Sequence, residues 1–80
     1  MVYIATFHTH FGAMSFRNQL CKRGDTAVMM PVPRALSASC GVCVRFQIPF
    51  DFDTMNVEDV EMVVTQAENG EYKLIFKNEE

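Results

Sequence analysis

The distribution of hydrophobic and polar positions predicts three strands most clearly. Residues 2–7 are β-branched and aromatic and precede a polar cluster, which is typical of a buried strand. Residues 42–48 alternate between an apolar side and a partly polar side that includes Cys43 and Arg45. Residues 72–77 alternate in the same way, and their lysines would protect an exposed sheet edge.

A fourth strand and two helices are predicted between these segments. Residues 26–32 have strand composition, and Pro31 suits an edge strand because it cannot donate a hydrogen bond. A first helix, capped near Thr9 and ending at Gly24, would bury Ala13, Phe16 and Leu20. A second helix would begin at Asn56 and end at Asn69-Gly70. Its buried stripe would be Val57, Val60, Val63, Val64 and Ala67.

The order strand, helix, strand, strand, helix, strand predicts an α+β fold. We expect a ferredoxin-like βαββαβ two-layer sandwich, with two helices on one face of a four-stranded antiparallel sheet. The 80 residues form a single domain, 1–80, in this interpretation. The end of the first strand, the start of the first helix and the start of the third strand would then share one rim of the sheet.

Charge is distributed unevenly within a net charge of -3. Residues 1–50 carry five lysine and arginine side chains against Asp25, whereas residues 51–80 carry nine acids against two lysines. A solvated acidic helix accounts for this better than a basic face for an anionic partner. Five cations without a recognisable motif also argue against a nucleic-acid partner.

The chain shows no sign of a membrane span or of secretion. Its apolar runs are far shorter than the roughly 20 residues that a spanning helix needs, and the N-terminus lacks a basic segment before an apolar one. We therefore expect a cytoplasmic protein that does not bind membranes. Three cysteines in a reducing compartment favour burial, metal binding or thiol chemistry over a disulfide framework.

The least generic chemistry lies in residues 31–46, PVPRALSASCGVCVRF. Cys40 is surrounded there by small, polar and cationic residues, a setting that lets a thiol ionise and meet a partner. The expected rim would also place Cys40 near the N-terminus of the first helix, whose dipole favours a thiolate. The candidate supporting residues are Arg34, Ser37, Ser39, Gly41, Cys43 and Arg45.

This run, together with a strand ending in Thr6-Phe7 and a helix with Ala13, Leu20 and Gly24, resembles the putative selenium/sulfur carrier-like protein family. The resemblance covers nearly the whole chain. It implies that Cys40 bears a sulfur or selenium atom. The partners it implies are proteins such as a cysteine desulfurase or a selenium/sulfur-transfer enzyme. We expect no cofactor and no independent enzymatic activity, because the sequence lacks phosphate-loop, triad and paired-carboxylate motifs.

Other functions remain compatible with the sequence. Cys40 and Cys43 form a CxxC, in which Cys43 could assist Cys40 or act as a resolving thiol. If Cys43 already belongs to the following strand, the two Cα atoms lie about 10 Å apart, too far for a disulfide, whereas a turn at Gly41 would bring them closer. His8 and His10 could join these cysteines in a zinc-like site if the two strand ends meet. A third alternative is a non-catalytic domain that acts only by packing on another protein.

Overall fold

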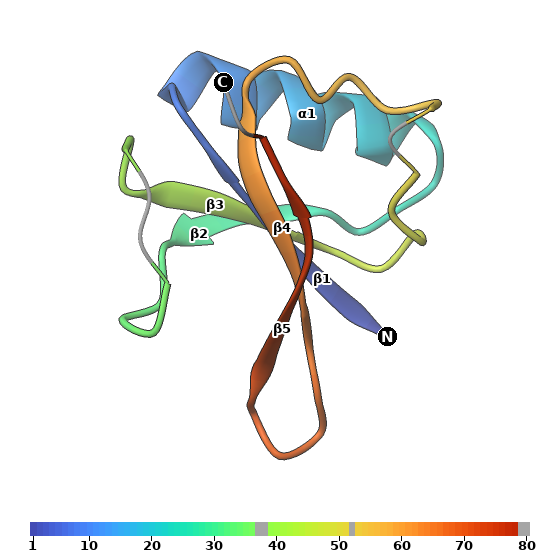
Figure 1. Ribbon diagram of the computed structural model, residues 1–80. Helices are drawn as coiled ribbons and strands as arrows, with labels where there is room; N and C mark the ends of the chain where they lie inside the picture. The colour runs from blue at the N-terminus through green and yellow to red at the C-terminus, as the bar shows by residue number, and fades with distance from the viewer. Residues whose placement is uncertain (37–38, 52, 79–80) are drawn as a thin grey trace.

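The computed structural model of the chain describes residues 1–36, 39–51 and 53–78 (Figure 1). One helix and five strands make up its described elements. In chain order they are β1 (Val2–Phe7), α1 (His10–Lys22), β2 (Val28–Pro31), β3 (Val42–Phe46), β4 (Val60–Gln66) and β5 (Tyr72–Lys77). No helix of the described chain has the length and apolarity that crossing a membrane requires.

The strands form one sheet in the order β2-β3-β1-β4-β5. Every neighbouring pair is antiparallel, and β1 lies at the centre, where Ala5 pairs with Val44 of β3 and Val63 of β4. The predicted edges are confirmed, because β2 with its terminal Pro31 and β5 with its lysines are the outermost strands. Edge positions suit both strands, since proline and lysine discourage pairing with another chain.

The predicted ferredoxin-like βαββαβ fold is wrong, because the expected second helix is β4. The segment does have apolar residues at helical spacing, but β-branched side chains are frequent in 60–66, and these favour a strand. The Asn56 side chain accepts a hydrogen bond from the Glu58 amide at 3.1 Å, which makes a local turn instead of a helix cap. The sheet therefore has five strands and is covered by a single helix in the described chain.

The Asn69-Gly70 pair closes a hairpin between β4 and β5 and does not end a helix. The Ala67 amide donates to the Glu71 carbonyl at 2.8 Å, and Gly70 has a φ of 90°. This left-handed backbone conformation favours glycine and is common in short hairpin loops. Asn-Gly between two alternating segments was therefore a hairpin signal.

The main core lies between α1 and the sheet. Phe16 of α1 contacts Phe7 of β1 and Phe46 of β3, with ring centroids 5.2 and 5.4 Å apart. Tyr3 stacks on Phe46 at 5.3 Å and extends the aromatic cluster. The connection from β3 to β4 runs beside α1 in Figure 1 and adds apolar cover where the second helix was expected. Its packed residues are Ile48, Phe50, Met55 and Val57.

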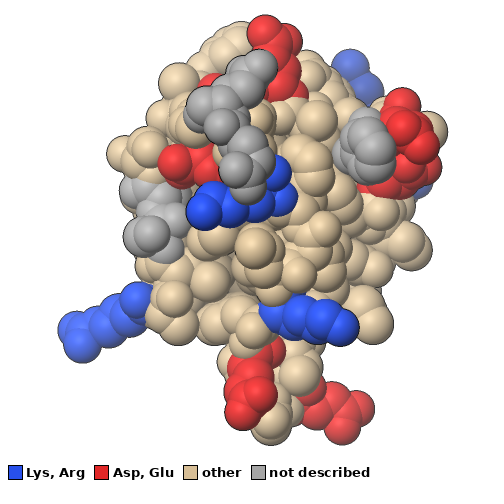
Figure 2. Space-filling model, in the orientation of Figure 1, with Lys and Arg blue, Asp and Glu red and all other residues tan. Residues whose placement is uncertain are grey.

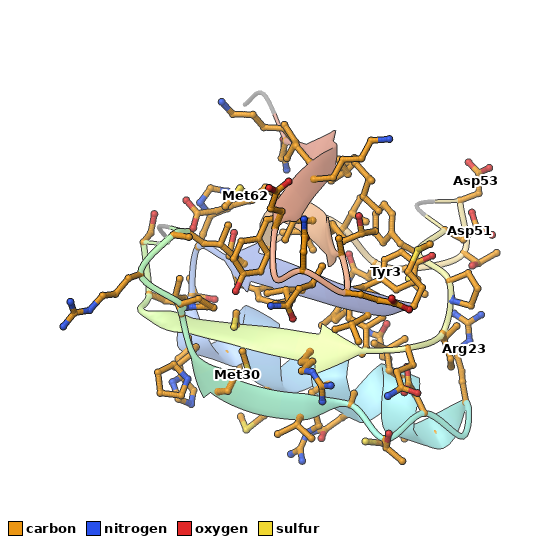
Figure 3. The ribbon with its side chains drawn as sticks, turned by 90° about the horizontal axis from the view of Figure 1, so that it is seen from below. Tyr3, Arg23, Met30, Asp51, Asp53 and Met62 are labelled. Atoms are coloured by element: carbon orange, nitrogen blue, oxygen red, sulfur yellow. The ribbon has the colours of Figure 1, made fainter. Side chains whose placement is uncertain are left out.

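A smaller apolar cluster lies on the sheet face away from α1. Ile4, Cys43 and Val64 are buried there without a helix above them in the described chain. Met30 and Met62 pack over them from β2 and β4, and both are visible in Figure 3, where α1 lies behind the sheet. Flexible methionine side chains suit this role because they fill irregular gaps.

The Asp25 carboxylate fixes the end of β3. Its Oδ2 accepts hydrogen bonds from the backbone amides of Gln47 and Ile48 at 3.0 and 2.9 Å. The Asp25 amide in turn donates to the Leu20 carbonyl at 3.1 Å. Asp25 thereby connects the end of α1 to the end of β3.

We predict that Asp25→Ala lowers the free energy of unfolding by about 1–3 kcal/mol, because two backbone donors lose a charged acceptor. Chemical denaturation followed by circular dichroism measures this change. Glu68→Ala, an exposed substitution in the β4–β5 turn, is the matched control and should leave stability unchanged. Equal stability of the two variants would contradict the role of Asp25.

Candidate functional site

Cys40 lies at the end of the loop that joins β2 to β3. Its side chain is half-buried and packs against the core between α1 and the sheet. The thiol donates to the Val42 carbonyl at 3.5 Å. Gly41, with a φ of 76°, makes the turn into β3, and its carbonyl accepts from the Val32 amide at 3.2 Å. The backbone on both sides of Cys40 is therefore held in place.

Glu61 holds this loop from the far side of β1, and sequence reasoning missed it. The residue occupies a β-bulge, since Thr6 and Phe7 pair with Met62 and Val60 and leave Glu61 without an opposite residue. Its carboxylate accepts from both the amide and the hydroxyl of Ser39, each at 2.8 Å. Bulges redirect side chains, and here the bulge directs a carboxylate to the residue before Cys40.

His8, which follows the end of β1, contacts both Glu61 and Asp59. Its Nδ1 lies 3.6 Å from the second carboxylate oxygen of Glu61. Its backbone amide donates to the Asp59 carbonyl at 3.0 Å. The end of β1, the start of β4 and the Cys40 loop therefore meet at one rim, which we call the Cys40 rim. Part of this rim was predicted from the sequence, but β4 was not part of that prediction.

The N-terminus of α1 does not serve Cys40 as the sequence suggested. Thr9 caps the helix as predicted, accepting from the Gly12 amide at 3.0 Å. The Asp59 carboxylate accepts from the amide and hydroxyl of Thr9 at 3.1 and 2.8 Å. A Cβ atom at Gly12 would overlap this carboxylate, so glycine leaves room for it. The anion at the helix start is therefore Asp59.

Of the predicted supporting residues, Gly41 and Ser39 shape the loop around Cys40. Ser39 does not offer its donors to a group on Cys40, because Glu61 already accepts from both. Arg34 and Arg45 are exposed, and within the described chain no hydrogen bond or ion pair joins either to Cys40. Ser37 lies outside the described residues. On the face shown in Figure 2, lysine and arginine side chains lie apart and form no single basic patch among the described residues.

Cys43 lies on the opposite face of the sheet from Cys40. It is fully buried beside Ile4 and Val64, and its thiol donates to the Pro31 carbonyl at 3.7 Å. Burial, with a smaller contribution from the charge of Cys40, raises the pKa of Cys43 from 9.0 to about 11. All three cysteines are reduced in this structure. Cys43 is consequently a protonated, inaccessible thiol at neutral pH, unsuited to act as a resolving partner.

The four proposed metal ligands are not brought together. His8 faces Glu61, His10 begins α1, and Cys43 is sealed on the other face of the sheet. The described part of the chain contains no group of three histidine, cysteine or acidic side chains arranged to hold a metal ion. The HxH pair fails as a chelate because the helix starts at its second histidine.

Comparison with known proteins gives one family. Residues 2–74 match the family model described as "Putative Se/S carrier protein-like". The match covers most of the chain and includes β1 through the first part of β5. No curated protein and no solved structure matches the chain.

We predict that Glu61→Ala loosens the Cys40 loop. Two donors of Ser39 lose their acceptor, so the free energy of unfolding should fall by roughly 1–2 kcal/mol. Alkylation of Cys40 by iodoacetamide, followed by peptide mass spectrometry, should become several-fold faster. Glu61→Gln is the control, because its amide oxygen still accepts from the Ser39 amide. Alkylation of Glu61→Ala at the wild-type rate would show that Glu61 does not hold the loop.

Because the pKa of Cys43 is raised in the folded protein, we predict that the protein is less stable at alkaline pH. The unfolded thiol ionises near pH 9, whereas the folded thiol resists ionisation until about pH 11. Folding therefore becomes less favourable as pH rises through this window, by about 2 kcal/mol at pH 11. Chemical denaturation at pH 8 to 11 measures how the free energy of unfolding falls with pH. In Cys43→Ala this free energy should fall less steeply. The same pH dependence in the wild type and in Cys43→Ala would contradict the raised pKa of Cys43.

Proposed function

The chain belongs to the family described as putative Se/S carrier protein-like, and we propose that it carries a sulfur or selenium atom on Cys40 and delivers it to a partner protein. The observation that carries this proposal is the contrast between the two thiols of the CxxC, Cys40 in the loop and Cys43 on β3. Cys40 is partly accessible in a loop held by Ser39 and Gly41, whereas Cys43 is buried. In this proposal the protein is a carrier and not an enzyme.

The exchange needs a thiolate and an accessible path. The Cys40 thiolate attacks the outer sulfur of a persulfide on a donor such as a cysteine desulfurase. A sulfur–sulfur bond forms on Cys40, the donor's sulfur–sulfur bond breaks, and the donor thiolate leaves. No net oxidation or reduction occurs, so the step requires no resident cofactor. The same displacement moves selenium when the donor carries it.

The surroundings of Cys40 support this chemistry on two counts. One side of its side chain packs against the apolar core, which limits the access of water to a bound chalcogen. Its loop is fixed through Glu61 and Val32, so the thiol is presented in a defined position. We place the exchange in the cytoplasm, where cysteines stay reduced. The expected partners are cysteine desulfurases or other selenium/sulfur-transfer enzymes.

We predict that the wild-type chain gains the mass of one sulfur atom when incubated with a cysteine desulfurase and free cysteine. A reductant should remove the added mass, since a persulfide is reducible. Cys40→Ser should gain nothing, because it lacks the accepting thiol. Cys21→Ser and Cys43→Ala are the matched controls and should load as the wild type does. Selenocysteine supplied in place of cysteine, from which the desulfurase forms a selenopersulfide, tests selenium. Loading of Cys40→Ser would contradict the proposal.

A further inference from the structure

The outer side of α1 exposes a large aromatic side chain. Phe11 is 74% exposed and Met14 is 39% exposed, although both lie on a helix whose buried side is already filled by Ala13, Phe16 and Leu20. Leaving a phenylalanine in water forgoes the stabilisation that burial would give. Exposed phenylalanine and methionine are also the residues enriched at protein interfaces.

Phe11 stands between two hollows. The first has a volume of about 270 Å³ and reaches inward to the core side chains Phe7 and Phe16. The second has a volume of about 310 Å³ and lies along Met14 and Lys22. A ridge with a hollow on each side can fix the position of a partner, because side chains from that partner fit beside the aromatic ring.

The first hollow has an acidic rim. Glu58 and Asp59 line it, and none of its lining residues is a lysine or arginine. Asp59 is bound to Thr9, but Glu58 is exposed and forms no ion pair with any described cation. Charge complementarity therefore favours a partner with a lysine or arginine next to an apolar side chain. A second copy of this acidic chain fits poorly, since it would add negative charge.

The hollow is connected to the Cys40 rim. Asp59 lines the hollow, and Glu61, two residues further along the chain, binds the residue before Cys40. Two residues of chain span at most about 7 Å between Cα atoms. His8 binds the backbone of Asp59 and lies beside the Glu61 carboxylate, so it links the same two places. A protein seated on Phe11 would have its surface next to the Cys40 loop.

We propose that Phe11, the two hollows beside it and Glu58 form the docking surface for the protein that loads Cys40. This inference rests on the proposed function and adds where the donor binds. The donor contributes an apolar side chain that enters the first hollow and a basic side chain that pairs with Glu58. The contact sets how often the donor's persulfide meets Cys40 and does not change the reactivity of the thiol itself.

The test measures sulfur transfer from a cysteine desulfurase to this chain by intact-protein mass spectrometry. Its readout is the kcat/KM of the transfer. Phe11→Ala should lower it by about 5- to 50-fold, the size expected for an aromatic interface anchor. Glu58→Lys should lower it and should also weaken its dependence on salt. Leu74→Ala and Glu68→Lys, on the β4–β5 hairpin, are the matched controls and should transfer as the wild type does.

Two further measurements distinguish weaker docking from an altered thiol and from self-association. Alkylation of Cys40 by iodoacetamide should proceed at the wild-type rate in Phe11→Ala, because a small reagent needs no docking surface. Wild-type transfer kinetics in both Phe11→Ala and Glu58→Lys overturn the docking surface and leave the carrier function standing. A wild-type chain that accepts no sulfur overturns the carrier function and the docking surface together. A dimer that dissociates in Phe11→Ala shows that a second copy occupies the surface and overturns the proposal.

Discussion

The contact of Phe16 with Phe7 and Phe46 is the interaction on which the arrangement of this protein depends. One helix must cover a sheet of five strands in the described chain, and this aromatic cluster fixes it over β1 and β3. Because β1 leads directly into α1, the same packing places His8 and Thr9 at the end of the sheet where β3 begins. Core packing thus brings the parts of the Cys40 rim together, and the hydrogen bonds of Glu61 and Asp59 then hold them.

The bulge in β4 also determines the geometry of the site. Without it, residue 61 would continue the regular pairing with β1, and its side chain would follow the alternation of the strand. The extra residue instead gives a carboxylate that binds Ser39 across the width of β1. Asp59, just before the strand, binds Thr9 at the start of α1. Two acids from one segment therefore hold the Cys40 loop and the helix start, which gives the acidic character of this part of the chain a structural role.

Elements were predicted correctly where the residue pattern is typical of either a helix or a strand alone. The prediction was wrong where one segment fits both patterns. β1 follows from its β-branched and aromatic composition, α1 from helical spacing, and β3 and β5 from alternation. The edge positions of β2 and β5 follow from proline and lysine. Segment 56–67 satisfied a helical stripe, but its β-branched residues and the Asn-Gly turn indicated a hairpin. This error hid Glu61 and Asp59, because their contacts exist only if β4 pairs with β1. The loop position of Cys40 was predictable because it depends only on the neighbouring sequence.

The alternation of β3 separates the two cysteines of the CxxC, which suits the proposed carrier function better than a disulfide. Val42 and Val44 pack toward α1, so Cys43 must lie on the other face, away from Cys40. A second accessible thiol would attack a persulfide on Cys40, form a disulfide and release hydrogen sulfide. Burial prevents this loss by excluding Cys43 from contact and by raising its pKa to about 11. β3 therefore keeps Cys43 away from Cys40, so in the proposed function Cys43 would not displace a chalcogen atom bound to Cys40.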